Sequence, residues 1–182
     1  MKNQMIAAVS LLALSACGGG GGSNFGAADY AAFASDPNLG ALTPDATVDA
    51  LNSSPTYNGY SSLIVGSGLD AVFYYGTLNV SANFSSNTLT GSTGNFTRYY
   101  SAIASPSNGQ SASGSIALNG TITPLDNTTF DGSIGGTAIG SIDGTTVNGD
   151  LTGRFTGLNA EGVSVTIDDS VNDVFGGGLA LQ

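Results

Sequence analysis

The chain has 182 residues, with 3 Lys or Arg, 13 Asp or Glu, one Cys, 28 Gly and no His or Trp. The absence of His excludes a Ser-His-Asp triad, a His-ligated zinc site and an imidazole base. A formal net charge of -10 argues against nucleic acid and against anionic lipid head groups as partners.

The start of the chain has the pattern of a bacterial lipoprotein signal. Basic Met1–Gln4 precedes the apolar run Met5–Leu14, which as a helix reaches about 15 Å, half of a bilayer core. Leu14–Cys17 places small residues before the Cys and predicts a signal peptide at 1–16 and acylation of Cys17, including palmitate. The alternative is an ordinary secretory signal followed by a free Cys, since one Cys forms no disulfide within the chain. Gly18 replaces the Asp that commonly retains lipoproteins in the inner membrane, which favours the outer membrane.

Two further segments precede the regular part of the chain. Residues 17–24 contain the acylated Cys and a Gly-rich tether, which is flexible by composition. Residues 25–56 are predicted as an irregular and helical lead-in, with a short helix that has Thr43 at its N-cap and Pro44 in its first turn. The lead-in carries three aromatic side chains, Phe25, Tyr30 and Phe33. These rings either pack on the domain or stay exposed for contact with a partner, and we expect packing.

From residue 57 onward, apolar residues recur with a period of two, as in half-buried antiparallel strands. The run 78–83, for example, alternates Leu, Val and Ala with Asn and Ser, and Asp143-Gly144 is one of several turn signals. The pattern predicts strands at 69–84, 88–97, 112–123, 128–135, 138–143, 145–157, 160–167 and 173–181, with a lead-in at 60–66.

Eight or nine strands within residues 57–182 make either a sandwich or a closed barrel. We predict an all-β fold, an eight-stranded antiparallel β-barrel with a filled core, because the chain beyond the signal has no Lys to guard strand edges. An outer-membrane barrel shows the same alternation. However, Gly interrupts the apolar phase and no pair of aromatic girdles is visible, so the pattern favours a barrel that does not itself span the membrane.

Three stretches of the barrel region resemble a known family. Gly149–Glu161, GDLTGRFTGLNAE, is similar to the signature GxFyGpnAeE in the β-barrel domain of transferrin-binding protein B and related surface lipoproteins. Gly76–Phe84, followed by Leu89–Gly91, resembles the family pattern of an alternating strand, a turn and LxG. Pro55–Tyr60 is similar to the entry strand of small single-barrel members. The likeness covers roughly residues 55–182.

The resemblance implies a barrel held at the cell surface by an acylated Cys. Larger members bind host proteins such as transferrin, and relatives bind haemoglobin or complement factor H. The implied function is a binding module for an external protein or nutrient carrier, accessory to an outer-membrane transporter. Thr156 stands where an aromatic residue is usual and Leu158 where Pro is usual, but both positions build the barrel. A different class of function, a structural periplasmic envelope lipoprotein without a specific ligand, stays open.

Two pairs of adjacent tyrosines are candidate binding residues, Tyr74-Tyr75 and Tyr99-Tyr100. Neighbours on a strand alternate, so one ring of each pair is expected in the core and the other outside. Because Tyr is enriched at binding hot spots, partner contacts are predicted at Tyr75, Tyr99 and Tyr100. A Tyr ligand for haem or iron is the alternative, but we predict no cofactor.

Two groups of acidic residues are candidate chemical sites. The run Asp168–Asp173 offers the oxygen ligands that Ca²⁺ prefers, but it lacks the spacing of an EF-hand and is predicted as a solvated hairpin rather than a metal site. A pair drawn from Asp143, Asp150 and Glu161 is the remaining acid–base option. Nothing in the sequence brings two of them together, and Glu161 is expected to make a structural hydrogen bond in its turn. We therefore predict that the protein is not an enzyme.

Overall fold

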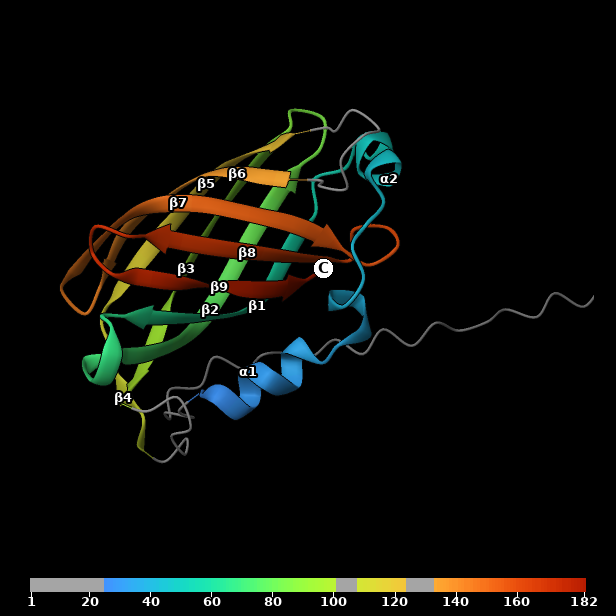
Figure 1. Ribbon diagram of the computed structural model, residues 1–182. Coiled ribbons are helices and arrows are strands. Elements are labelled where there is room, and N and C mark those ends of the chain that lie inside the picture. Colours follow the sequence, from blue (N-terminus) through green and yellow to red (C-terminus); the bar gives the residue numbers. More distant parts are fainter. Residues whose placement is uncertain (1–24, 101–107, 124–132) are drawn as a thin grey trace, which may run out of the picture.

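The structure, a computed structural model, describes residues 25–100, 108–123 and 133–182. Figure 1 shows a closed antiparallel β-barrel with a helical segment along its outside. The eight wall strands are β1 (Thr56–Val65), β2 (Val72–Asn83), β3 (Thr88–Tyr99), β5 (Gly114–Thr123), β6 (Ser133–Ile142), β7 (Thr145–Thr156), β8 (Gly162–Asp169) and β9 (Val174–Leu181). They are hydrogen-bonded in the order β2-β1-β9-β8-β7-β6-β5-β3, and the pairing of β2 with β3 closes the barrel. The predicted eight-stranded barrel is confirmed.

Two strand predictions need correction. The lead-in at 60–66 belongs to a full wall strand, β1, which begins at Thr56. The separate strands predicted at 128–135 and 138–143 are replaced by one strand, β6, while residues 128–132 lie outside the described part of the chain. Gly136 and Thr137, which separate the two predicted strands, both pair with β5 and β7. A Cβ on Gly136 would lie 2.1 Å from the Asn119 carbonyl oxygen, so Gly is needed there for close approach of β5.

The barrel interior is filled by the apolar side chains that alternate along the strands. At one end the rings of Tyr57 and Phe84 lie 6.0 and 4.9 Å from the ring of Phe155. Helix α2 (Asp45–Ala50) covers this end, which we call the cap end, and its Val48 is part of the same core. Two buried hydroxyls inside the barrel, those of Ser61 and Thr93, are hydrogen-bonded to each other.

The opposite end of the barrel, which we call the loop end, is formed by the connections β1–β2, β3–β5, β6–β7 and β8–β9. The first connection contains the 3-10 helix η2 (Gly68–Asp70). The second contains β4 (Gln110–Ser111), which pairs with β3 at Thr97 and Arg98.

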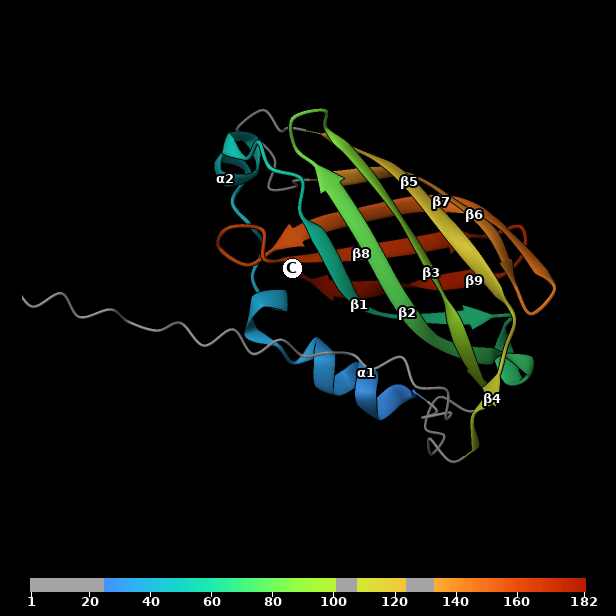
Figure 2. The ribbon, with the colours of Figure 1, turned by 180° about the vertical axis from the view of Figure 1, so that it is seen from behind.

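Residues 25–44 form what we call the strap, which runs along the outside of the barrel and contains α1 (Ala27–Ala34) and the 3-10 helix η1 (Pro37–Leu39). Figure 2 shows α1 beside the barrel from the side of β2 and β3. The ring of Tyr60 on β1 stacks on Phe25 at 4.1 Å and meets Phe33 edge-on at 5.1 Å. The expectation that the aromatic residues of this segment pack on the domain is therefore confirmed.

The far end of the strap is hydrogen-bonded to the end of β7. Thr43 N–H donates to Phe155 O at 3.0 Å, and the Thr43 hydroxyl donates to Gly157 O at 2.7 Å. Thr43 is thus not the N-cap of α2, as predicted, because its hydroxyl is used by the barrel; Pro44 occupies that position. Within the described residues, no helix has the length and apolarity needed to cross a bilayer.

Candidate interaction surface at the loop end

Three connections at the loop end each present a large apolar side chain to solvent. Leu69 in η2 is fully exposed, Val171 in the β8–β9 turn is 89% exposed, and Tyr100, directly after β3, is 69% exposed. We call these three side chains the apolar tips. Each belongs to a different connection, and the neighbouring Phe175 at the start of β9 is also exposed. Apolar side chains gathered at one end of a domain are typical of an interaction site.

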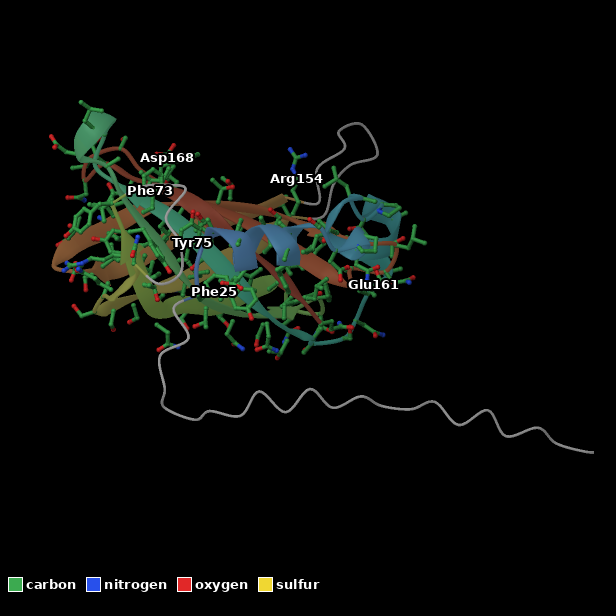
Figure 3. All side chains as sticks on the ribbon, turned by 90° about the horizontal axis from the view of Figure 1, so that it is seen from below. Phe25, Phe73, Tyr75, Arg154, Glu161 and Asp168 are labelled. Carbon is green, nitrogen blue, oxygen red and sulfur yellow. The ribbon has the colours of Figure 1, made fainter. Side chains whose placement is uncertain are left out.

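Carboxylates accompany the apolar tips. Asp70 follows Leu69 directly, and Asp168 and Asp173 flank the turn that carries Val171; all three are exposed. Figure 3 shows Asp168 and Phe73 at the same end of the barrel. The loop end therefore combines exposed apolar side chains with exposed negative charge.

The side chain of Arg98 links three elements at the loop end of the barrel. Its Nη1 donates to Asp143 Oδ2 in the β6–β7 turn, and its Nε and Nη2 donate to Gln110 Oε1 on β4 at 3.1 and 2.9 Å. The guanidinium also lies 5.8 Å from the ring centroid of Tyr100. The hydrogen bond and charge of Asp143 raise the pKa of Arg98. These hydrogen bonds connect β3 and β4 to the β6–β7 turn, and the contact with Arg98 places Tyr100 at the loop end.

The register of β2 and β3 explains why the side chain of Arg98 lies at the loop end. The β2–β3 pairing shifts between Tyr75 and Thr77, and Asn95 has a φ of 53°, so β3 bulges at this point. Beyond the bulge Arg98 pairs with Tyr74, whose ring packs inside the barrel against Phe96. Burial, followed by the charge of Asp143, raises the pKa of Tyr74, so its phenol stays neutral.

The predicted partner contacts at Tyr75 and Tyr99 are placed differently from Tyr100. Tyr74 points inward and Tyr75 outward, as the alternation predicts, but Tyr75 is only 6% exposed because the strap covers it. The rings of Phe25 and Tyr30 lie 6.4 and 6.2 Å from the ring of Tyr75. Tyr99 is also buried, and its hydroxyl donates to Phe25 O at 3.0 Å. Of the three predicted contact residues, Tyr100 alone reaches solvent.

The acidic run at the β8–β9 turn contains a structural carboxylate. Asp169 is buried and accepts hydrogen bonds from Asn148 N at 2.8 Å, Asn172 Nδ2 at 2.8 Å and the amides of Val171 and Asn172, each at 3.2 Å. The bond from Asn148 N is the main cause that lowers the pKa of Asp169. This carboxylate organises the turn that presents Val171. No group of three or more potential metal ligands occurs in the part of the chain that the structure describes.

The three carboxylates considered for acid–base chemistry lie apart. Asp143 is paired with Arg98 at the loop end, whereas Glu161 lies in the β7–β8 turn at the cap end (Figure 3). Glu161 accepts hydrogen bonds from Asn159 N and Nδ2, both at 2.8 Å, which lower its pKa. The expected structural role of Glu161 is confirmed. Asp150 lies on the outside of β7, where its register partner on β8 is Asp168.

Sequence reasoning missed Leu69 and Val171; Leu69 was placed at the start of the strand predicted at 69–84, whereas it lies in η2 and β2 begins at Val72. Each is a single apolar residue between turn-forming neighbours, in Gly68-Leu69-Asp70 and Ser170-Val171-Asn172. An apolar residue at a turn, without a strand to bury it, is the signal that would have found both. Cys17 and the predicted signal peptide lie outside the described residues.

Solved structures with a similar fold include a surface lipoprotein and transferrin- and lactoferrin-binding proteins. A crystal structure described as a surface lipoprotein matches with a TM-score of 0.50 and 14% identity over 71% of this chain and 61% of that one. Isotype 1 transferrin-binding protein B from serogroup B Neisseria meningitidis matches with a TM-score of 0.51 and 14% identity over 77% of this chain and 28% of that one. The N-lobe domain of lactoferrin-binding protein B from Moraxella bovis has a TM-score of 0.46 and 18% identity, with coverages of 77% and 60%.

These similarities concern the fold. The domain is a barrel like that of transferrin-binding protein B, as the sequence resemblance predicts. The chain spans 61% of the surface lipoprotein and 28% of the transferrin-binding protein. No protein-family model matches the chain, and no curated protein matches it in sequence.

Proposed function

We propose that this protein is an outer-membrane lipoprotein, anchored through acylated Cys17 and displayed at the cell surface, whose barrel binds an external protein through the loop end. The observation that carries the proposal is the presence of the apolar tips on three separate connections of one barrel end. Its role is binding rather than catalysis, and the ligand is a protein or a protein nutrient carrier. The similar solved structures, a surface lipoprotein and a transferrin-binding protein, support this class of function.

Charge defines the kind of partner. The exposed Asp70, Asp168 and Asp173 surround the apolar tips, and Arg98, the basic residue described at this end, is paired with Asp143. An apolar patch with a rim of Lys and Arg on the partner complements this surface, and such complementarity accelerates association. A bilayer with anionic head groups is disfavoured by the same carboxylates.

The length of the tether supports a partner close to the membrane. Phe25 is eight positions after Cys17, so these residues lie at most about 29 Å apart in a fully extended chain. Phe25 is held by Tyr99, the last residue of β3 and the neighbour of Tyr100. Because the strap packs on the barrel, the tether joins the domain nearer to the loop end than to the cap end. An external protein bound at the loop end would therefore be held close to the membrane, where it can be passed to an outer-membrane transporter.

Surface display is tested by protease digestion of the barrel on intact cells, with lysed cells as the control. Digestion in intact cells is the expected result. Protection until lysis would place the barrel in the periplasm and would favour the structural envelope lipoprotein instead.

Binding through the loop end is tested by crosslinking on intact cells with a triple variant, Leu69→Ser, Tyr100→Ser and Val171→Ser. The matched control is Leu158→Ser, which removes an apolar side chain that is 75% exposed in the β7–β8 turn at the cap end. We expect the triple variant to lose a crosslinked protein that the control retains. Loss of binding to phosphatidylethanolamine vesicles, with crosslinking unchanged, would identify the loop end as a membrane contact instead.

A further inference from the structure

The outer wall of the barrel carries a row of apolar side chains where β9, β1 and β2 reach the loop end. In the strand register, Phe175 on β9 lies opposite Ile64 on β1, which in turn lies opposite Phe73 on β2. Phe175 is 55% exposed, and the other two are half-buried. Side chains at opposite positions are about 5 Å apart, so the three form one surface, which we call the apolar row. Nearer the cap end, the outward-facing Thr77 and Asn79 of β2 are polar instead.

A hollow adjoins the β9 end of the apolar row. It has a volume of about 160 Å³ and is lined by Gly66 of the β1–β2 connection, by the β8–β9 turn and by Phe175. The amide of Gly66 donates to Asp173 O at 2.9 Å, which holds the connection against the turn. At about 30 Å³ for each water molecule, the hollow has room for about five waters. It therefore admits the end of one long side chain rather than a whole small-molecule ligand.

Two carboxylates at the hollow are available to a ligand. Asp168 and Asp173 are exposed and line the hollow, and neither carboxylate makes a hydrogen bond or an ion pair within the described residues. Asp168 also lies opposite Asp150 on β7, and like charges at opposite positions destabilise a sheet. The third carboxylate, that of Asp169, is already used, because it accepts hydrogen bonds from Asn148 N and from its own turn. The charge of the hollow therefore favours a cation.

The exposed ring beside these carboxylates selects among cations. A guanidinium is planar, stacks on an aromatic face and offers a fork of N–H donors, so it can contact Phe175 and Asp168 together. The ammonium group of a lysine is compact and strongly hydrated, so it gains less from the ring. A Ca²⁺ ion requires about six to eight oxygen ligands, whereas the described residues contain no group of three or more potential metal ligands. The hollow is therefore best matched by an arginine side chain.

We propose that the partner protein docks against this side of the loop end, with one arginine side chain in the hollow and apolar side chains on the apolar row. The inference rests on the function proposed above and specifies what the partner presents. The apolar row is continuous along the chain with two of the apolar tips, since Leu69 lies between β1 and β2 and Val171 lies in the turn before β9. Arginine is enriched at the hot spots of protein interfaces, and a net charge of -10 attracts a basic partner.

The hollow is tested with Nα-benzoylarginine amide, which carries one guanidinium and one aromatic ring, and with the uncharged Nα-benzoylcitrulline amide as control. The chain from residue 17 onward carries Cys17→Ser, so that no detergent competes for the apolar row, and binding is followed by amide chemical shifts in NMR spectra. We expect a Kd of about 1–5 mM for the arginine compound, with shifts at Gly66, Asp168 and Phe175. The citrulline compound is expected to bind at least about fivefold more weakly, because it lacks the charge.

Variants separate the contributions of charge and ring. Asp168→Asn is expected to weaken the binding of the arginine compound by about three- to fivefold, and Phe175→Ala by about two- to fivefold. Asp49→Asn is the matched control for the carboxylate, since Asp49 is exposed on α2 at the cap end. Ile139→Ala is the matched control for the ring, since Ile139 is 51% exposed on β6. Both controls are expected to leave binding unchanged.

Docking of the partner is tested by the same crosslinking on intact cells that tests the proposed function. Asp168→Arg is expected to lose the crosslinked protein, because it places a positive charge where the partner's arginine binds, and Asp49→Arg to retain it. Ile64→Ser and Phe73→Ser are expected to reduce crosslinking, whereas Ile139→Ser leaves it unchanged. These variants remove apolar contacts from the row and from a separate part of the wall, respectively.

Three results would overturn the inference while the proposed function stands. The first is equal binding of the arginine and citrulline compounds, or binding that Asp168→Asn leaves unchanged. The second is displacement of the arginine compound by about 5 mM Ca²⁺ but not by NaCl of equal ionic strength, which would assign the hollow to that ion. The third is a crosslinked protein that the triple variant loses and Asp168→Arg retains, which would show that the tips bind the partner without the hollow. Absence of any crosslinked protein for the parent would instead refute the proposed function, and this inference with it.

Discussion

Two adjacent glycines of β6 provide a sharp test of the barrel geometry. A Cβ on Gly136 would lie 2.1 Å from the Asn119 carbonyl oxygen and 2.6 Å from Gly120 Cα, whereas a Cβ on Gly135 would meet nothing within 4 Å. An ordinary contact at these atoms starts at 3.4 Å, so Gly136→Ala must push β5 and β6 apart by about 1.3 Å. Both contacts are to backbone, which cannot rotate away as a side chain can.

The magnitudes follow from this difference. Overpacking against a closed wall typically costs about 1–3 kcal/mol, and the backbone contacts place Gly136→Ala at the upper end of that range or above it. Gly135→Ala meets no obstacle and restricts the unfolded chain, so a gain of about 0.4–1 kcal/mol in the free energy of unfolding is expected. The two variants add the same methyl group at neighbouring positions, so they form a matched pair.

Urea unfolding of the chain from residue 17 onward, carrying Cys17→Ser to avoid detergent, measures both changes. The expected result is a lower midpoint for Gly136→Ala and an equal or higher midpoint for Gly135→Ala. Equal midpoints for the two variants would refute the close approach of β5 to Gly136. The two separate strands predicted from the sequence, 128–135 and 138–143, would instead leave Gly136 outside a strand and free of this contact.

Three further predictions concern the anchor and two buried oxygens. Cys17→Ser is expected to release the protein from the membrane fraction without unfolding it; a variant that remains membrane-bound but folded would contradict acylation at Cys17. Asp169→Asn is expected to lower the free energy of unfolding at pH 7 by about 1.5–3 kcal/mol, because charged hydrogen bonds to the turn weaken. The lowered pKa of Asp169 means that the carboxylate stabilises the fold above the unfolded value of about 3.9, and that this contribution disappears as the pH falls through the lower folded pKa. Melting temperatures from pH 2 to 7 test this, since equal acid sensitivity of parent and Asp169→Asn would refute it. Thr156→Val is expected to raise the free energy of unfolding of the unliganded protein by about 1 kcal/mol, measured by urea unfolding, and destabilisation would show that the hydroxyl has a partner.

The barrel could be predicted because its main signal is local. Alternation from residue 57 onward places every second side chain in the core, so Tyr74 inside and Tyr75 outside follow from strand geometry alone. The role of Glu161 was likewise local, since its partner Asn159 is two residues away. Such features depend on neighbours in the sequence, which are visible without a structure.

The candidate site was harder to predict because it depends on distant segments. The burial of Tyr75 and Tyr99 results from the strap, and Phe25 and Tyr99 are separated by 74 positions in the sequence. No periodicity connects two such segments. Thr43 illustrates the same limit, because a hydroxyl that suits an N-cap is instead used by Gly157, 114 residues later.

Because of the path of the strap, the tether joins the domain near the loop end and not at the cap end, where β1 begins. Strand β1 begins at the cap end, so a tether joined directly to Thr56 would suspend the domain with its loops pointing away from the anchor. The strap instead carries the chain along the outside, and Phe25 and Thr43 hold it at both ends. Residues inserted between Cys17 and Phe25 would lengthen the tether and leave the barrel unchanged, whereas residues 52–55 are hydrogen-bonded to the end of β2 and the turn after it and so belong to the folded domain. Stand-off from the membrane and barrel folding are therefore encoded in separate stretches of the chain, and each is free to vary without the other.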